Sequence, residues 1–367
     1  MHLGVAVMAS VRRSGCSAPL VVIAALFGIG CGNDGPREGD AHLLRARGRH
    51  LLDIVAAPSP NPDTNFSLVL SGRVSESGKH VLLVDMRPPY LRVYRRSGEL
   101  RSAFLRRGRG PAESRGVMGV AVAGDSLILV ADIDGRVRTF DLDGHLRQNL
   151  PEFPFGVISA TTACPGEWLL YGARFSADGR SAQWLHRLPI GAGPESLAGV
   201  FAEPVSSTEP RTAMANGLVA TRSGVALWHH LGPAPALVTW HCGAASASFG
   251  AIDDGATPPP PPRKIPGGIV TATTPGSHLR GGLAGAAGAL FKSEFVNATA
   301  KVPEYSEVAA VAARRNTPVR LPGWIVLLDS RPGVGVLMQV YRGEEQRIIL
   351  LSERDFLALA GGEGGRP

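Results

Sequence analysis

Residues 91–101, Leu-Arg-Val-Tyr-Arg-Arg-Ser-Gly-Glu-Leu-Arg, recur 46 positions later as residues 137–147, Val-Arg-Thr-Phe-Asp-Leu-Asp-Gly-His-Leu-Arg. Upstream, the apolar run Leu82–Asp85 matches Leu129–Asp132 at an offset of 47 positions. A period of about 20–50 residues is typical of proteins built from repeated structural units. This repeat therefore decides the fold class.

Each copy of the repeat has the pattern of successive antiparallel strands. An apolar run ends at an aspartate, and after a turn comes a segment in which side chains alternate between two faces. The pairs Ser97-Gly98 and Asp143-Gly144 then supply the positive φ that tight hairpins require. Four short strands in 40–50 residues are typical of one propeller blade.

Fainter copies of the unit follow downstream. The 296 residues from 61 to 356, divided by the repeat length, correspond to about six blades. We therefore predict an all-β fold, a β-propeller with six blades of four antiparallel strands, and leave seven shorter blades open. The weaker copies are residues 168–171 with 183–188, 217–220 with 225–228, 268–272 with 289–291, and 324–329 with 336–343.

Three further elements are expected around the repeats. The strand Phe66–Leu70 is predicted to close the ring by pairing with the last blade, because closure removes exposed sheet edges. Five consecutive prolines at 258–262 predict a surface loop. Residues 306–315 carry the start and stop signals of a short helix, and residues 357–367 are predicted to be a disordered tail.

The segment Gly108–Glu113, Gly-Arg-Gly-Pro-Ala-Glu, follows the first unit. With the repeats it resembles exported bacterial six-bladed β-propeller proteins with NHL-like repeats, in which a Gly-x-Gly-Pro-x-Glu segment links consecutive blades. The resemblance covers residues 70–150, with partial support at 323–343, and residues 245–320 depart from it. It implies a ring-shaped scaffold that binds proteins, glycans or small molecules, although a few propeller relatives are hydrolases or metal-dependent lyases.

The first 30 residues have the pattern of a secretion signal. Arg12 and Arg13 precede an apolar run at 18–30, which is too short to span a bilayer. The segment ending at Cys31 resembles a bacterial lipobox, which predicts lipid attachment at Cys31 and a flexible tether over 31–60. Ordinary cleavage nearby is the alternative. The expected location is the cell envelope, with the lipid anchor in the outer membrane and the domain facing the periplasm or the surface.

Two cysteines remain in the predicted mature domain beyond Cys31. In an oxidising compartment Cys164 and Cys242 would be able to form a disulfide. The sequence does not establish that they are close, so a bridge and two buried thiols both stay open.

The composition narrows the function classes. Hydrophobic residues make up 44% of the chain and charged residues 19%, which is enough apolar surface for a large core. The net charge of +7 comes from 38 basic residues that are nearly all arginine, and skewed codon usage explains that excess. We therefore predict no nucleic-acid partner.

Arginines are densest between residues 87 and 115, and two interpretations follow. A guanidinium group suits phosphate or carboxylate recognition, so an anion-binding surface is one hypothesis. A solvated outer strand in an arginine-biased chain is the other, and the composition favours it. The candidate anion-binding residues are Arg92, Arg95, Arg96, Arg106, Arg107 and Arg109.

No motif indicates a cofactor, and a divalent metal stays an alternative. The aspartates of 132–135 and 141–144 resemble truncated calcium loops, but the repeat demands hairpin turns there. His229, His230 and His241 have no known zinc spacing, and adjacent residues of a strand point to opposite faces. The predicted function is an envelope-anchored binding or scaffolding module for an envelope protein, glycan or anionic ligand. The sequence favours a protein that is not an enzyme. The alternative is a metal-dependent, lactonase-like hydrolase or lyase.

Overall fold

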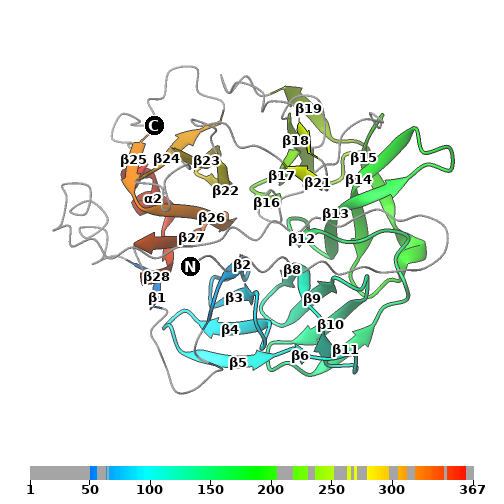
Figure 1. Cartoon of the computed structure of the whole chain (residues 1–367), viewed down its shortest axis with the longest axis horizontal. Helices are drawn as coiled ribbons and strands as arrows, with labels where there is room; N and C mark the ends of the chain where they lie inside the picture. The colour runs from blue at the N-terminus through cyan, green and yellow to red at the C-terminus, as the bar shows by residue number, and fades with distance from the viewer. Residues whose placement is uncertain are drawn as a thin grey trace.

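The structure is a ring of six four-stranded antiparallel sheets (Figure 1). This computed structural model describes residues 50–55, 63, 66–204, 218–229, 236–251, 263–265, 268–270, 279–296, 305–311, 319–342 and 345–360. The six-bladed β-propeller expected from the repeat is confirmed. Cys31, His230 and the prolines at 258–262 lie outside the described residues.

The first three blades follow one another along the chain, each with its innermost strand first. The turns within these blades are short. Blade 1 contains β2 (Val69–Val74), β3 (His80–Asp85), β4 (Leu91–Arg95) and β5 (Leu100–Phe104); blade 2 contains β8 (Val117–Ala123), β9 (Leu127–Asp132), β10 (Val137–Asp141) and β11 (Leu146–Asn149); blade 3 contains β12 (Ser159–Thr161), β13 (Glu167–Phe175), β14 (Ser181–Pro189) and β15 (Ala198–Pro204).

The last three blades have the same order, except that the final blade borrows its outer strand from the beginning of the chain. Blade 4 contains β16 (Leu218–Thr221), β17 (Gly224–His229), β18 (Ala236–His241) and β19 (Ser248–Ala251); blade 5 contains β22 (Leu279–Ala286), β23 (Ala289–Val296), β24 (Tyr305–Ala310) and β25 (Val319–Pro322); blade 6 contains β26 (Trp324–Arg331), β27 (Gly335–Arg342), β28 (Glu345–Leu351) and β1 (Leu52–Val55). Short pairs are formed by β6 (Arg106–Arg107) with β7 (Glu113–Ser114) and by β20 (Arg263–Ile265) with β21 (Gly268–Val270).

The burial pattern explains why the second strands of blades 1 and 2 contain continuous apolar runs. All six residues of β3 are buried, whereas β11 at the outer edge of blade 2 is mostly exposed. Neighbouring blades pack face to face, so that Leu82 of blade 1 and Ile128 of blade 2 belong to one buried cluster. A strand inside the blade is therefore covered on both faces, and its sequence does not alternate between apolar and polar residues as that of a half-exposed strand does.

The aspartates of the truncated calcium-like loops cap hairpin turns, as the repeat predicted. The Asp132 carboxylate accepts N–H groups of Asp134 at 3.1 Å and Arg136 at 2.9 Å. Asp141 accepts those of Asp143 and His145, both at 2.9 Å. These carboxylate oxygens therefore satisfy turn backbone groups in each hairpin.

The expected closing strand was wrong. The ring closes where β1 pairs with β28, with Leu52 opposite Leu350, and Figure 1 shows these two strands side by side. Val69 and Leu70 begin β2 instead, at the inner end of blade 1. The predicted start of the propeller at residue 61 was also wrong, because β1 lies inside the predicted tether of residues 31–60. The four residues of β1 lie outside the repeat, and so short a segment carries too little periodic signal to be assigned to a sheet.

Two of the fainter copies were assigned to the wrong strand of their blades. The run 324–329 belongs to β26, and 217–220 overlaps β16; both are innermost strands, whereas the matching runs of blades 1 and 2 are second strands. In blade 5 the copy at 268–272 was wrong, because β21 pairs only with β20. Inner and second strands are both buried on two faces, so their apolar runs look alike in the sequence.

The helix predicted at 306–315 and the start of the tail predicted at 357 were also wrong. Residues 306–310 lie in β24, which pairs with β23 on one side and β25 on the other, so sheet pairing overrides helix propensity. The helix α2 (Glu353–Leu359) continues past residue 356 into the start of the predicted tail, and its Leu359 is buried. No helix in the described part of the chain is long and apolar enough to cross a membrane.

Candidate functional site

The axis of the ring is occupied by one arginine. Arg73 lies on the innermost strand of blade 1 and is 2% exposed. Its guanidinium donates hydrogen bonds of 2.9–3.3 Å to groups of blades 1, 2, 3 and 6. The acceptors are the carbonyl oxygens of Gly72, Val120, Ala160 and Leu328 and the Ser159 hydroxyl. Because a guanidinium presents five donors in a plane, it can join several strands at once.

Buried polar groups surround this arginine. Burial lowers the pKa of Arg73, and the charge of Asp329 opposes that shift. Burial likewise raises the pKa of Asp329, opposed by Arg73 and by the Val74 N–H, which donates to Asp329 at 2.8 Å. Arg331 pairs with Glu76 at 2.8 Å and donates to the Thr162 carbonyl. Asp329 Oδ1 has no hydrogen-bond partner among the described residues, whereas Arg73 and Arg331 donate to groups of neighbouring blades, so the arginines make the axis at this level a structural joint between blades.

One of the six candidate anion-binding arginines is buried. Arg92 is 1% exposed, and its guanidinium donates to Asp85 and to the Pro89 carbonyl, both at 2.9 Å. Arg138 and Asp132 form the same pair in blade 2, at 3.0 Å. The aspartate and arginine of the repeat are therefore a buried structural pair, and Arg92 does not face solvent.

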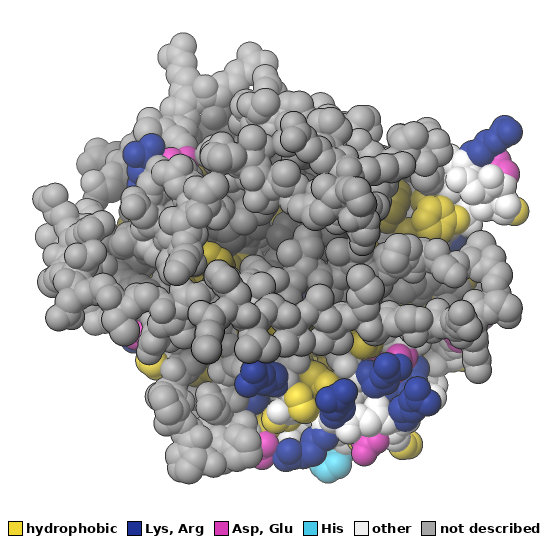
Figure 2. Space-filling view, viewed as in Figure 1, with side chains coloured by type: hydrophobic (Ala, Val, Ile, Leu, Met, Phe, Trp, Pro, Cys, Tyr) yellow, Lys and Arg dark blue, Asp and Glu magenta, His cyan; other side chains and the backbone are white. Residues whose placement is uncertain are grey.

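The other five arginines lie at opposite ends of blade 1. Arg95 ends β4 and Arg96 lies in the turn from β4 to β5, whereas Arg106, Arg107 and Arg109 follow the far end of β5. Two of them have acidic partners, Glu99 with Arg95 at 3.4 Å and Asp63 with Arg106 at 3.1 Å. Figure 2 shows Lys and Arg side chains along the lower edge of the molecule with carboxylates between them. The structure therefore does not bring the six arginines into one site.

Of the three candidate histidines, the structure describes His229 and His241, and it does not bring these two together. In the pairing of β17 with β18, His241 is opposite Gly224 and His229 is opposite Ala236, so the two histidines lie at opposite ends of the pair. Across the ranges that the structure describes, no three His, Cys, Asp or Glu side chains are close enough to hold a metal ion.

A disulfide joins Cys164 and Cys242, with Cα atoms 5.7 Å apart. Cys164 lies in the turn between β12 and β13, and Cys242 in the turn between β18 and β19. The sequence left this bridge open, and the structure has it as a covalent link between blades 3 and 4.

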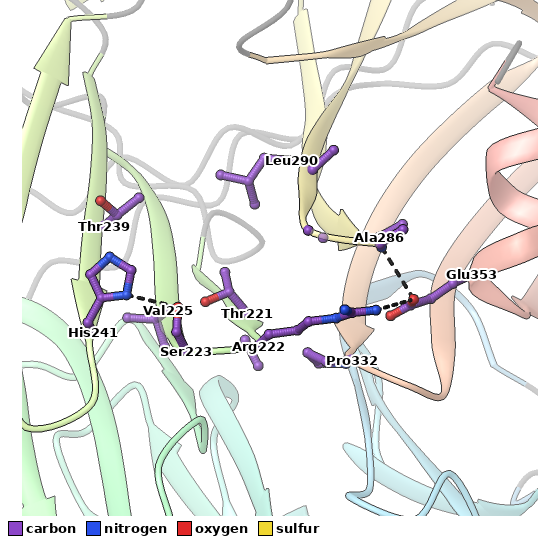
Figure 3. Close-up of a pocket in the computed structure, with 15 residues that line it drawn as sticks. Thr221, Arg222, Ser223, Val225, Thr239, His241, Ala286, Leu290, Pro332 and Glu353 are labelled. Atoms are coloured by element: carbon purple, nitrogen blue, oxygen red, sulfur yellow. Dashed lines mark hydrogen bonds and ion pairs between the residues drawn. The ribbon is translucent and has the colours of Figure 1, made fainter. Parts of the chain in front are cut away.

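A pocket of about 190 Å³ lies near this link (Figure 3). Arg222 and Ser223 of the β16–β17 turn form one side, and the β22–β23 turn, Ala287 with Gly288, forms another. Glu353, at the start of α2, completes it. In an antiparallel blade the turns between first and second strands all lie at one end, which we call the pocket face. The turns between second and third strands lie at the other end, the opposite face.

Two polar contacts order the pocket. The Glu353 carboxylate accepts N–H groups from Gly333 at 2.9 Å and Ala287 at 3.3 Å, and lies 3.6 Å from the Arg222 guanidinium. Ser223 Oγ lies 2.8 Å from His241 Nδ1. Figure 3 shows Arg222 extending across the pocket toward Glu353. Glu353 therefore ties together turns from three blades.

Among these polar residues, only His241 was a candidate from the sequence. The sequence could have placed Arg222 and Ser223 on an exposed turn, because with Gly224 they separate one apolar run from the next. Nothing in the sequence places them beside Glu353, which is 131 positions away in the chain. Such a pocket exists only after the blades have assembled.

The sequence matches no known protein family and no curated protein. Among solved structures, the β-propeller domain of Cps50 (Swd1) from Myceliophteria thermophila is 9% identical, with a TM-score of 0.44, over 77% of this chain and 97% of that chain. The WD40 repeats of RRP9 are 10% identical, with a TM-score of 0.45, over 82% and 97%. The structure of U3-55K is 10% identical, with a TM-score of 0.42, over 82% and 98%. Similarity at this level brings neither function nor partners to this chain.

Proposed function

We propose that this protein is an exported β-propeller binding module that engages its partner on the pocket face. Arg73 fills the ring axis at the level of the inner strands, so the axis offers no binding site there. The pocket face carries turns from every blade on a rigid scaffold, and such loops are where binding residues concentrate.

The observation that carries this proposal is the pocket, and its size limits what enters it. Pockets for drug-sized ligands usually measure about 300–1,000 Å³, whereas a cavity of about 150 Å³ accommodates benzene. At about 190 Å³ the pocket has room for one side chain or a comparably small molecule. A binding module that recognises a single inserted group fits this size better than an enzyme with a large cofactor.

The Cys164–Cys242 bridge supports export, because disulfides persist in oxidising compartments and are rare in the cytosol. Lipid attachment at Cys31, an NHL-like bacterial ancestry and a location in the cell envelope remain part of the proposal. Replacing Cys31 with Ser should release the protein from the membrane fraction of the native host. Unchanged fractionation of Cys31→Ser would count against the anchor.

Site-specific photocrosslinking tests the binding face. A benzoylphenylalanine at Ala289, which lines the pocket and is exposed, should give a discrete adduct in the envelope of the native host. The matched control places the same group at Ile133, which is 45% exposed in a second-to-third turn on the opposite face. Adducts of equal yield at both positions, or none at Ala289, would contradict the proposal.

A hydrolase is the second candidate, and one contact favours it. Ser223 Oγ and His241 Nδ1 are at the distance of a nucleophile and its general base. A fluorophosphonate probe should then label the wild-type protein and leave Ser223→Ala unlabelled. Absence of labelling would leave the pair as a turn hydrogen bond.

For the metal-dependent alternative, the corresponding experiment is metal analysis of the domain from Gly32 onward, before and after chelation.

A further inference from the structure

Among the described polar groups around the pocket, Arg222 carries the positive charge, and every other one except Glu353 can donate a hydrogen bond as well as accept one. Arg222 is a donor with no acceptor capacity, and Ser223, Thr221, Thr239 and His241 can each donate. A ligand group that pairs with Arg222 must present acceptors, and the charge of the guanidinium favours an anionic acceptor.

Glu353, the one carboxylate among the lining residues that the structure describes, is already satisfied. Glu353 is 16% exposed at its side chain, and its two oxygens accept the N–H groups of Gly333 and Ala287. These backbone bonds hold the negative charge of Glu353 whether or not Arg222 pairs with it. A second carboxylate can therefore approach Arg222 without leaving Glu353 unpaired.

Arg222 is placed to accept such a ligand. Its side chain is 67% exposed, and the 3.6 Å separation from Glu353 is longer than a hydrogen bond. Exposed pairs of this kind contribute little to stability, so the guanidinium can reorient at small cost. Figure 3 shows it lying across the pocket between the side that carries Ser223 and the side that carries Glu353.

The remaining lining is apolar and small. Val225 and Ala286 are buried, and Leu290 and Pro332 are partly buried. Burial of an apolar group against them would be favourable, and the volume of about 190 Å³ admits about one ring or one branched chain. The ligand therefore combines an acidic head with a short apolar tail.

We propose that the pocket binds a monocarboxylate with an apolar tail of about that size, its carboxylate paired with Arg222. This inference rests on the proposed function of the pocket face and gives its ligand chemistry. The same chemistry is found in a free organic acid and in the C-terminal residue of a partner protein that ends in an apolar side chain.

Titration of the mature domain by NMR or calorimetry, with small probes, tests this inference. Phenylacetate should bind, and phenylacetamide, which has the same shape without the charge, should bind at least about tenfold more weakly, because charge-assisted hydrogen bonds are the stronger ones. Acetyl-Gly-Gly-Phe and its C-terminal amide form the second pair. Binding of the free peptide acid as well as phenylacetate identifies a protein C-terminus as a source, and binding of phenylacetate alone identifies a small acid.

Arg222→Gln should weaken phenylacetate binding at least about tenfold while the melting temperature stays unchanged, because the side chain is largely exposed. Arg96→Gln, an exposed arginine in the turn between β4 and β5, is the matched control and should bind as wild type. Equal binding of acid and amide, equal binding by Arg222→Gln, or no binding of either acid would overturn the inference. If crosslinking at Ala289 still succeeded in that case, the proposed function would stand with a different ligand.

Discussion

Replacing Arg73 with Met should destabilise the whole ring. The side chain is buried at the axis and donates to acceptors from four blades, so its loss affects the contacts of all four together. Met has a similar length and no charge, which leaves the hydrogen-bond acceptors unpaired without creating a large cavity. Asp329 would also lose the positive charge that lowers its pKa.

The expected loss is about 3–5 kcal/mol in the free energy of unfolding. Each buried acceptor left unpaired contributes about 1–3 kcal/mol, and the buried Asp329 carboxylate loses a nearby positive charge. Uptake of a proton by Asp329 would offset part of the loss. With about 2–4 °C per kcal/mol for a chain of 150–250 residues, the melting temperature of this longer chain should fall by roughly 10 °C.

Thermal and denaturant unfolding, followed by circular dichroism, measure this effect. The control is Arg115→Met, because Arg115 is 43% exposed and pairs with Asp134 at the surface, where loss should stay below about 1 kcal/mol. Adding Asp329→Asn to Arg73→Met should recover part of the loss, since it removes the uncompensated carboxylate. If Arg73→Met were no less stable than Arg115→Met, the view of Arg73 as the joint between blades would be refuted.

The pH dependence of the Arg73→Met variant provides a second check. The pKa of Asp329 already lies above its ordinary value of 3.8, and losing the arginine charge raises it further. A carboxyl with a raised folded pKa contributes stability below the unfolded pKa that is lost as the pH rises through the folded pKa. The deficit of the variant relative to wild type should therefore be smaller at pH 4 than at pH 7.

Three other predictions concern single sites. Reduction of the Cys164–Cys242 bridge, which spans 78 positions, should destabilise the fold by about 2–4 kcal/mol, and a melting curve that does not move with reductant would contradict this. Burial lowers the pKa of His186 to about 4, so the free energy of unfolding should fall by up to about 3 kcal/mol as the pH drops from 6.5 toward 4. The free energy of unfolding of His186→Gln, measured in parallel, should depend less on pH. Ser352→Ala removes the acceptor for the Asp355 N–H at the start of α2 and should reduce stability by about 1 kcal/mol in urea unfolding, with Ser126→Ala, at an exposed turn, as the neutral control.

Blades 1 and 2 were predictable because their information is local. The apolar run, the alternating strand and the hairpin turns lie within one 46-residue unit, and the strands they specify are neighbours in both sequence and space. The aspartates of the calcium-like loops were assigned to turns for the same reason. In each case the hydrogen bonds that decide the local structure join residues a few positions apart.

The role of the repeat's arginines was not predictable from their density. Arg92 and Arg107 look alike in the sequence, yet Arg92 is buried against Asp85 and Arg107 faces solvent. The strand Leu52–Val55, which closes the ring, has no repeat partner at all. Both depend on which face of which sheet a residue occupies, and that is set by pairing with distant strands.

The sequence by itself determined the repeat and the four-stranded hairpin unit and left six or seven blades open, because period-2 patterning and turn chemistry act over a few residues. Only the tertiary structure decided how the ring closes, that Arg73 joins four blades at the axis, and that Arg222 and Glu353 line one pocket. These contacts connect blades rather than residues within a blade. They form only when the ring closes, because the curvature of the whole assembly brings the inner strands and their turns together.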